Sequence, residues 1–291
     1  MGRPIPQPPL GTDVNMSGTR APALRGALYV ARKVPEVTIF FWIVKLLSTA
    51  MGESTTDYFV FHIDPYVAVI LGGIGFVVAM TLQLAVRRYV AWIYWLAVVM
   101  VAVFGTMAAD VLHVVLHVPY AVSSASFAIA LVVVFISWYA TERTLSIHTI
   151  NTRRRELFYW ATVVATFALG TALGDLTATT LNTATGLKLG YFASTVMFAV
   201  IFLLPGLGFW LFRLNPIFAF WFAYVVTRPL GASFADWVGR SPTIGGLGWG
   251  EGPVSLGLGA LLVVFVVYLT ITRVDVKDAK NPSAHTASPR T

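Results

Sequence analysis

The 291-residue chain contains no cysteine and few charged residues. Without thiols, disulfides, thiolate metal sites and iron–sulfur clusters are excluded. Only 11% of the residues are charged, against roughly 25% in a typical soluble domain, while 57% are hydrophobic. No serine stands in a nucleophile-elbow motif and no other nucleophile–base pattern is found, so we expect neither an enzyme nor a cofactor.

Long apolar runs make up most of the sequence. Eight of them cover approximately residues 36–61, 65–86, 90–116, 119–140, 157–181, 187–212, 215–238 and 253–272. A membrane-spanning helix needs about 20 mostly apolar residues, and these runs lack the alternation of barrel strands. The sequence therefore predicts an all-α polytopic membrane protein with eight transmembrane helices, embedded in a lipid bilayer.

The two ends of the chain differ from this pattern. Residues 1–31 are rich in Pro, Gly, Arg and Ala, and residues 274–291 are similarly poor in large apolar side chains. No apolar segment follows the first basic residue as it would in a secretory signal. We expect flexible cytoplasmic tails at 1–31 and 274–291, flanking a membrane domain at 32–273.

One pattern occurs four times. A Trp is followed ten residues later by a Gly and five residues after that by an Asp, and each Trp is preceded by Phe or Tyr. The four sets are Trp42/Gly52/Asp57, Trp95/Gly105/Asp110, Trp160/Gly170/Asp175 and Trp221/Gly231/Asp236. The pattern lies in alternate runs, and the runs between them carry small residues that let membrane helices approach closely.

This alternation predicts a two-helix unit repeated four times. The units cover about residues 33–86, 89–140, 155–212 and 215–272. Because each unit crosses the membrane twice, all four have the same orientation, as parallel repeats related by an axis along the membrane normal.

Lysine and arginine are distributed unequally between the two ends of the spans. One end, which also holds both termini, carries Arg32, Lys33, Arg87, Arg88, Arg143, Arg153, Arg154, Arg155, Arg213, Arg273, Lys277 and Lys280. The opposite end has only Lys188 and Arg240. The positive-inside rule places both termini in the cytoplasm. Because no basic face is interleaved with aromatics, we expect no nucleic-acid partner despite the net charge of +7.

Helix geometry gives the depth of the repeated residues. The fifteen residues from Trp to Asp span about 22 Å, so each Trp lies at the depth of an interfacial aromatic and each Asp lies in the outer part of the membrane. Trp and Asp share a helix face. The Gly faces elsewhere, either as a contact point for a neighbouring helix or as a local break.

A carboxylate inside a membrane helix is costly and usually has a function. In the first two copies apolar residues continue beyond the Asp, which places it inside the span. We expect Asp57, Asp110, Asp175 and Asp236 to form a shared polar site. The alternative is that each carboxylate reaches the headgroup water at the end of its own helix.

Several residues depart from the repeat. Glu53 adds a second acid one turn deeper than Asp57, and two cations, Lys45 and Arg228, lie within apolar spans. A buried cation needs a partner, so we expect both to pair with Glu53 or with an Asp of a neighbouring repeat. Such a pair is either purely structural or couples the site to a conformational change.

The second copy also contains His113 and His117 close to Asp110. Their spacing places them on one helix face, where imidazole and carboxylate together suit a transition metal. The alternative is a pair of solvated histidines near the outer interface.

Three stretches, Lys33–Asp57, Arg155–Asp175 and Thr227–Asp236, resemble a bacterial family of uncharacterised membrane-anchored proteins built from a tandem repeat of unknown function. The resemblance extends over about Lys33 to Tyr268. It implies a location in the bacterial inner membrane, and it supplies no substrate.

Carboxylates flanked by Ser and Thr hydroxyls suit hard cations or a proton relay. The leading hypothesis is therefore a transporter or exporter of a small cation, either a divalent metal or a proton-coupled ion, that uses the four aspartates and Glu53. The alternative is a non-transporting assembly or sensory module in which the aspartates serve helix packing.

Overall fold

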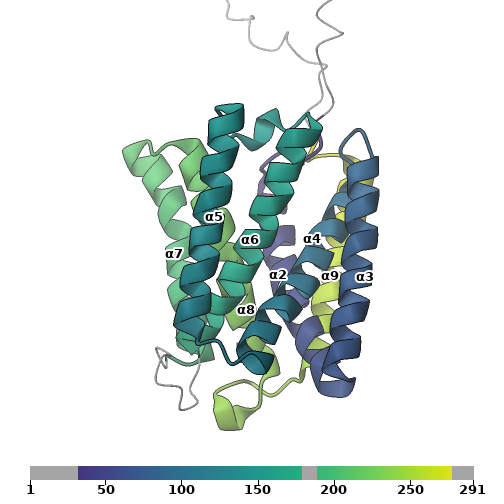
Figure 1. Ribbon diagram of the computed structural model, residues 1–291, viewed down its shortest axis with the longest axis vertical. Helices are drawn as coiled ribbons and strands as arrows, with labels where there is room; N and C mark the ends of the chain where they lie inside the picture. The colour runs from purple at the N-terminus through teal and green to yellow at the C-terminus, as the bar shows by residue number, and fades with distance from the viewer. Residues whose placement is uncertain (1–31, 179–188, 277–291) are drawn as a thin grey trace, which may run out of the picture. The chain divides into compact units, whose positions relative to one another are not determined.

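The computed structural model describes residues 32–178 and 189–276, and within these ranges the chain is all-α, with no strand. Its eight long helices are α2 (Ile39–His62), α3 (Pro65–Ala85), α4 (Ala91–Asp110), α5 (Tyr120–Glu142), α6 (Arg153–Ala178), α7 (Tyr191–Phe212), α8 (Pro216–Gly239) and α9 (Glu251–Thr272) (Figure 1). Three short segments connect them: the π-helix η1 (Val111–Val115) and the 3₁₀ turns η2 (Ile147–Thr149) and η3 (Pro242–Ile244). The all-α prediction is confirmed.

The predicted tails and Lys188 lie outside the described residues, except for residues 274–276. In that short segment Asp275 is buried: its backbone oxygen accepts a hydrogen bond from the Glu36 amide, and its side chain accepts one from the Tyr89 hydroxyl. Burial raises the pKa of Asp275, and the hydrogen bond from Tyr89 partly offsets this rise. The packed segment thus includes three residues that the sequence analysis assigned to the tail.

Local sequence explains where the helices begin and end. Asp64 and Asn215 cap α3 and α8 by accepting backbone N–H bonds, and each is followed by a proline at the first helical position. The outer helices α5, α7 and α9 end at Arg143, Arg213 and Arg273, each in the left-handed conformation. A cation at a helix C-terminus is favourable to the helix dipole.

Seven of the eight helices are long and apolar enough to cross a membrane. The exception is α2, whose 24 residues include Lys45, Glu53 and Asp57. All three are candidate site residues of the sequence analysis, so these charges keep α2 from being recognised as a span by its apolar composition.

The helices form an inner ring and an outer shell. The inner helices α2, α4, α6 and α8 each contact the next one along the chain, and α8 returns to α2, so that the ring is closed (Figure 1). In α4, α6 and α8, 56% to 61% of the membrane-spanning stretch is buried, against 11% to 22% in α3, α5, α7 and α9. The four copies of the Trp–Gly–Asp pattern all lie on the inner helices.

Each outer helix packs mainly on the inner helix of the following repeat rather than on its own. Thus α3 packs on α4, α5 on α6, α7 on α8, and α9 on α2. The last hairpin therefore closes the ring against the first, so no repeat can bury its inner helix without its neighbour.

The repeated glycines mark the contacts between neighbouring inner helices. A Cβ atom added at any of the four would press on the next helix of the ring, on the residue three positions before that helix's own glycine. The pairs are Gly52 with Ala102, Gly105 with Phe167, Gly170 with Arg228, and Gly231 with Thr49. The helices run through all four glycines without interruption, so these glycines are contact points and not breaks.

The repeated aromatics follow the same cyclic order. The residue before each Trp lies beside the Trp of the next repeat, with ring centroids 5.6 to 6.1 Å apart. These pairs are Phe41–Trp95, Tyr94–Trp160, Tyr159–Trp221 and Phe220–Trp42. Trp95, Trp160 and Trp221 are at most 5% exposed because neighbouring helices cover them.

Candidate functional site

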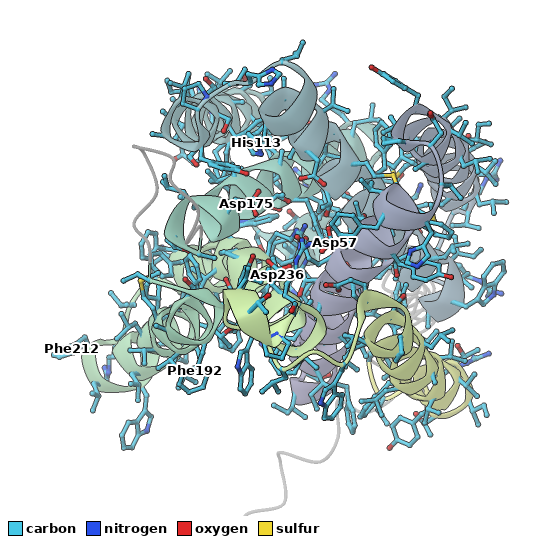
Figure 2. The ribbon with its side chains drawn as sticks, turned by 90° about the horizontal axis from the view of Figure 1, so that it is seen from below. Asp57, His113, Asp175, Phe192, Phe212 and Asp236 are labelled. Atoms are coloured by element: carbon cyan, nitrogen blue, oxygen red, sulfur yellow. The ribbon has the colours of Figure 1, made fainter. Side chains whose placement is uncertain are left out.

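The structure brings the four repeated aspartates together at one end of the inner ring. With Glu53 and Glu251 they form a carboxylate cluster, defined here as Asp57, Asp110, Asp175, Asp236, Glu53 and Glu251. Three overlapping groups of side chains contain these residues, and within each group the possible ligand atoms lie within 4.8 Å of one another: Asp110/His113/Asp175, Glu53/Asp175/Asp236 and Asp57/Asp236/Glu251. Figure 2 shows Asp57, Asp175 and Asp236 in the middle of the helices, whereas Phe192 and Phe212 of α7 lie toward the edge.

Arg228 lies beneath this cluster, and its side chain is fully buried. One guanidinium nitrogen donates to Glu53 at 2.5 Å, to the Thr106 hydroxyl, and to the Thr171 hydroxyl at 2.8 Å. The three acceptors each follow the repeated glycine of their own helix. One arginine from the fourth repeat thus binds the same position in the other three, and its predicted pairing with Glu53 is confirmed.

Lys45 is buried as well, but its predicted carboxylate partner is absent. Within residues 32–178 and 189–276 no acidic oxygen lies within ion-pair distance of its ammonium. The nitrogen instead lies over the rings of Phe167 and Tyr224, 4.0 and 4.3 Å from their centroids. Arg228 occupies the repeat position of Thr49, and Lys45 lies four residues before Thr49. Lys45 is therefore one helical turn farther from the acids than Arg228, and Arg228 pairs with the Glu53 carboxylate.

Arg240, just beyond the end of α8, closes one side of the cluster. It donates to Asp57 at 2.7 Å and to Asp236 at 3.1 Å, and it lies 3.7 Å from Glu251. Burial opposes its charge, but the three carboxylates raise the pKa of Arg240 above its usual value, so it stays charged. A single positive charge is therefore shared by three carboxylates.

His113 extends the other side of the cluster. It lies in the π-helix that continues α4, three residues after Asp110, and its Nδ1 is 3.6 Å from an oxygen of Asp175 on α6. His117, the second predicted histidine, is not part of the cluster. The π-helix ends before it, and His117 is exposed with a left-handed backbone (φ 55°), so the predicted common helix face is wrong.

Three residues that contribute to the site were not among the predicted site residues. They are Glu251, Arg240 and Ser123, whose hydroxyl lies 2.7 Å from Nε2 of His113. Glu251 begins α9, in a glycine-rich segment that reads as a loop, and has no counterpart in the other repeats. Arg240 appeared only as an exception to the positive-inside pattern. Its spacing of four residues from Asp236 is the one sequence signal that could have suggested an ion pair.

Four inner helices in a closed ring, an apolar outer shell and a repeated polar layer define a multi-pass membrane protein built from internal repeats. The chain belongs to the family described as Repeat of Unknown Function (DUF347), whose model matches residues 40–89, 93–144, 158–214 and 219–275. No curated protein and no solved structure matches the chain.

Proposed function

We propose that this protein transports a small cation across a membrane and that the carboxylate cluster is its binding site. The observation that carries the proposal is the convergence of acidic side chains from every repeat on one end of the inner ring. Six carboxylates in a low-dielectric helix bundle repel one another, and only cations relieve that repulsion.

The counter-charges are unequally distributed, which favours an ion site on one side of the cluster. Arg240 pairs with Asp57 and Asp236, and Arg228 pairs with Glu53. Asp110 and Asp175 form no ion pair with lysine or arginine in the part of the chain that the structure describes. Both are only partly buried, so an ion entering from this end of the ring meets them first.

On the opposite side of the carboxylate cluster, further layers of buried side chains block the proposed cation pathway. Below the cluster come Arg228, then Lys45, and then the layer of repeated aromatics. The buried guanidinium of Arg228 repels an incoming cation. Transport therefore requires the Arg228–Glu53 ion pair to open or shift, which gives Arg228 a coupling role and Lys45 a supporting one.

The proposal includes a topology. α2 crosses the membrane with the other seven helices, because it occupies the same place in the ring as α4, α6 and α8. The arginines at the ends of α5, α7 and α9 mark the cytoplasmic side, which also holds both termini. The carboxylate cluster then faces the outside of the bacterial inner membrane.

The proposal is tested by replacing Asp110 and Asp175 with Asn in cells that depend on the protein. Growth under excess metal and cellular metal content are measured across a panel of divalent ions. Asp64→Asn is the matched control: Asp64 is exposed, and asparagine caps α3 as well as aspartate does. A change in both variants but not in the control supports transport, whereas unchanged metal content for every ion contradicts it.

A second function, a non-transporting assembly or sensory module, is favoured by one observation: Asp57, Asp236 and Glu53 are already held by arginines. Two of these ion pairs, Arg240–Asp57 and Arg228–Glu53, connect α2 to α8 and to the residue that follows it. If packing is their purpose, Asp57→Asn keeps hydrogen bonding and folds, while Asp57→Ala is lost from the membrane, and metal content stays unchanged in both.

A further inference from the structure

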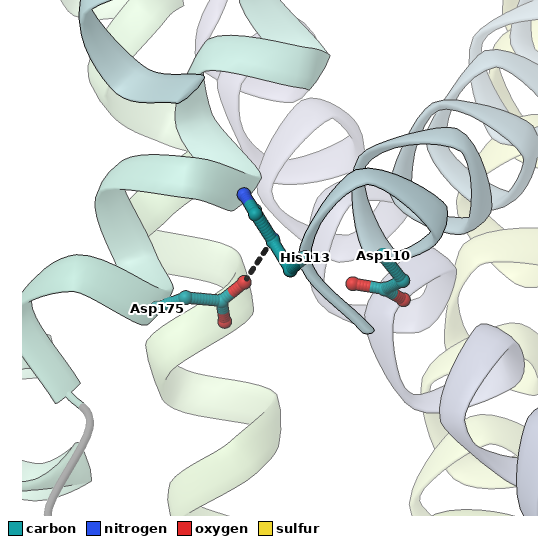
Figure 3. Close-up of side chains that lie close together, drawn as sticks. All are labelled: Asp110, His113 and Asp175. Carbon is teal, nitrogen blue, oxygen red and sulfur yellow. Dashed lines mark ion pairs between the residues drawn. The ribbon is translucent and has the colours of Figure 1, made fainter. Parts of the chain in front are cut away.

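We propose that Asp110, His113 and Asp175 form a binding site for one divalent transition-metal ion, of the Mn²⁺ or Zn²⁺ type. This assignment names the substrate class of the transporter proposed above and rests on that function for its physiological role. The binding site itself is argued from geometry. Figure 3 shows the three side chains together, with Asp110 and His113 on one helix and Asp175 on the next.

The three residues are positioned by helix structure. Asp110 is the last residue of α4, and His113 lies three residues later in the π-helix η1. Asp175 faces them from α6, and one ligand atom of each residue lies within 4.8 Å of the others. π-Helical turns frequently occur at functional sites, and among the four repeats only this one has such a turn at its Asp within the described residues.

The surroundings of the His113 ring favour a cation beside its Nδ1. Its side chain is only 3% exposed, and its Nε2 lies 2.7 Å from the Ser123 hydroxyl. That hydroxyl donates its proton to the Tyr120 carbonyl at 3.0 Å, so its oxygen accepts the Nε2 proton. With its proton on Nε2, the ring has a lone pair on Nδ1.

This buried Nδ1 makes no hydrogen bond to any residue that the structure describes. Its nearest charged neighbour is the Asp175 carboxylate at 3.6 Å, which also carries lone pairs. Buried acceptors that face one another without a donor are unfavourable. A metal ion between the imidazole and the two carboxylates satisfies all three at once.

The arrangement around His113 is typical of a metal ligand. A ligating histidine usually donates its other ring N–H to a second group that fixes the ring and its tautomer, and Ser123 has this position. The donor set of one nitrogen and two carboxylates also decides the class of ion. Imidazole favours transition metals such as Zn²⁺, whereas Mg²⁺ and Ca²⁺ prefer oxygen ligands only.

The experiment measures metal binding by the purified full-length protein in lipid nanodiscs. MnCl₂ and ZnCl₂ are titrated separately, with bound ion counted by electron paramagnetic resonance for Mn²⁺ and by calorimetry for Zn²⁺, and MgCl₂ and CaCl₂ serve as competitors. The variants are Asp110→Asn, Asp175→Asn, His113→Gln and Ser123→Ala. The matched controls are Asp64→Asn and His62→Gln, both exposed positions on the same side of the protein.

We expect one transition-metal ion per chain, with binding weakened at least tenfold in the three ligand variants and about tenfold in Ser123→Ala. The controls bind as the unaltered protein does, and size-exclusion profiles show which variants fold. Even if His113→Gln does not fold, competition on the unaltered protein remains decisive: Mg²⁺ at equal concentration must not displace Mn²⁺.

Any one of three results overturns the assignment. The first is that the unaltered protein binds no more metal than the Asp110→Asn/Asp175→Asn double variant, and the second is that Mg²⁺ competes equally. The third is that Asp57→Asn loses metal binding while Asp175→Asn keeps it. These results are separate from a failure of transport. A protein that binds Mn²⁺ at this site without moving it contradicts the proposed function and leaves the site standing.

Discussion

The guanidinium of Arg228 lies 2.5 Å from the Glu53 carboxylate, although the two residues are 175 positions apart. Arg228 occupies the repeat position that holds Thr49, Ala102 and Phe167 in the other copies. Glu53, Thr106 and Thr171 share another repeat position, and all three accept from the same arginine. A single substitution in the fourth repeat thus ties all four repeats together at the centre of the ring.

Removing the charge of only one partner of this ion pair is expected to destabilise the fold strongly. In Arg228→Gln, Glu53 remains buried without a counter-charge, which lowers the free energy of unfolding by about 3–5 kcal/mol. The double variant Arg228→Gln/Glu53→Gln recovers most of this loss because no buried charge remains. Reversible denaturation in mixed micelles measures both, and equal losses in the single and double variants would contradict the pairing.

The closed ring predicts a sharp difference between two glycines. A Cβ at Gly231 presses on Thr49 and lies 2.9 Å from the Ala50 nitrogen, so Gly231→Ala should lower the free energy of unfolding by about 1–3 kcal/mol. Gly206 in α7 has no atom within 4 Å of such a Cβ, so Gly206→Ala is the control and should not destabilise. Equal midpoints for the two variants would show that α8 does not close against α2.

Lys45 is expected to reduce stability. Its charge is buried without a carboxylate, and contact with two aromatic rings returns only about 2 kcal/mol of a desolvation penalty of several kcal/mol. Lys45→Met keeps the length of the side chain and should raise the thermal midpoint. A midpoint lowered by several degrees would mean that the lysine has an anionic partner.

The absence of cysteine makes the topology directly testable. Arg88→Cys, between α3 and α4, should react with a membrane-impermeant maleimide only when the cytoplasmic side is open. His62→Cys, at the end of α2, should react in intact cells. Because these two positions flank α3, the two results together require α3 to cross the membrane. Labelling of both positions from the same side would contradict the eight-span arrangement.

Much of the scaffold was predictable because periodic patterns report local structure directly. The apolar runs gave the eight helices with bounds close to those observed, and the Trp–Gly–Asp spacing gave the four repeats. The spacing also showed that the aspartates lie at equal depth. It did not show which neighbouring helix covers each face, so the burial of Trp95, Trp160 and Trp221 was not predicted.

The contacts between repeats were harder to predict, since a repeat fixes equivalence but not the order of packing. Nothing in the local sequence shows that α9 packs on α2, or that Asp175 faces His113 across a helix boundary. The π-turn was equally hidden, and it removed His117 from the helix face. Arg228 and His113 stood out in the sequence as departures from the repeat, but Asp175 as the neighbour of His113 did not.

The most direct measurement is metal flux in proteoliposomes containing the purified protein. The account predicts accumulation of Mn²⁺ or Zn²⁺ against a matched empty-liposome control, abolished in Asp110→Asn/Asp175→Asn and retained in Asp64→Asn. Flux that is undetectable for every divalent ion, or identical in the double variant and the unaltered protein, would contradict the claim that the carboxylate cluster carries cations.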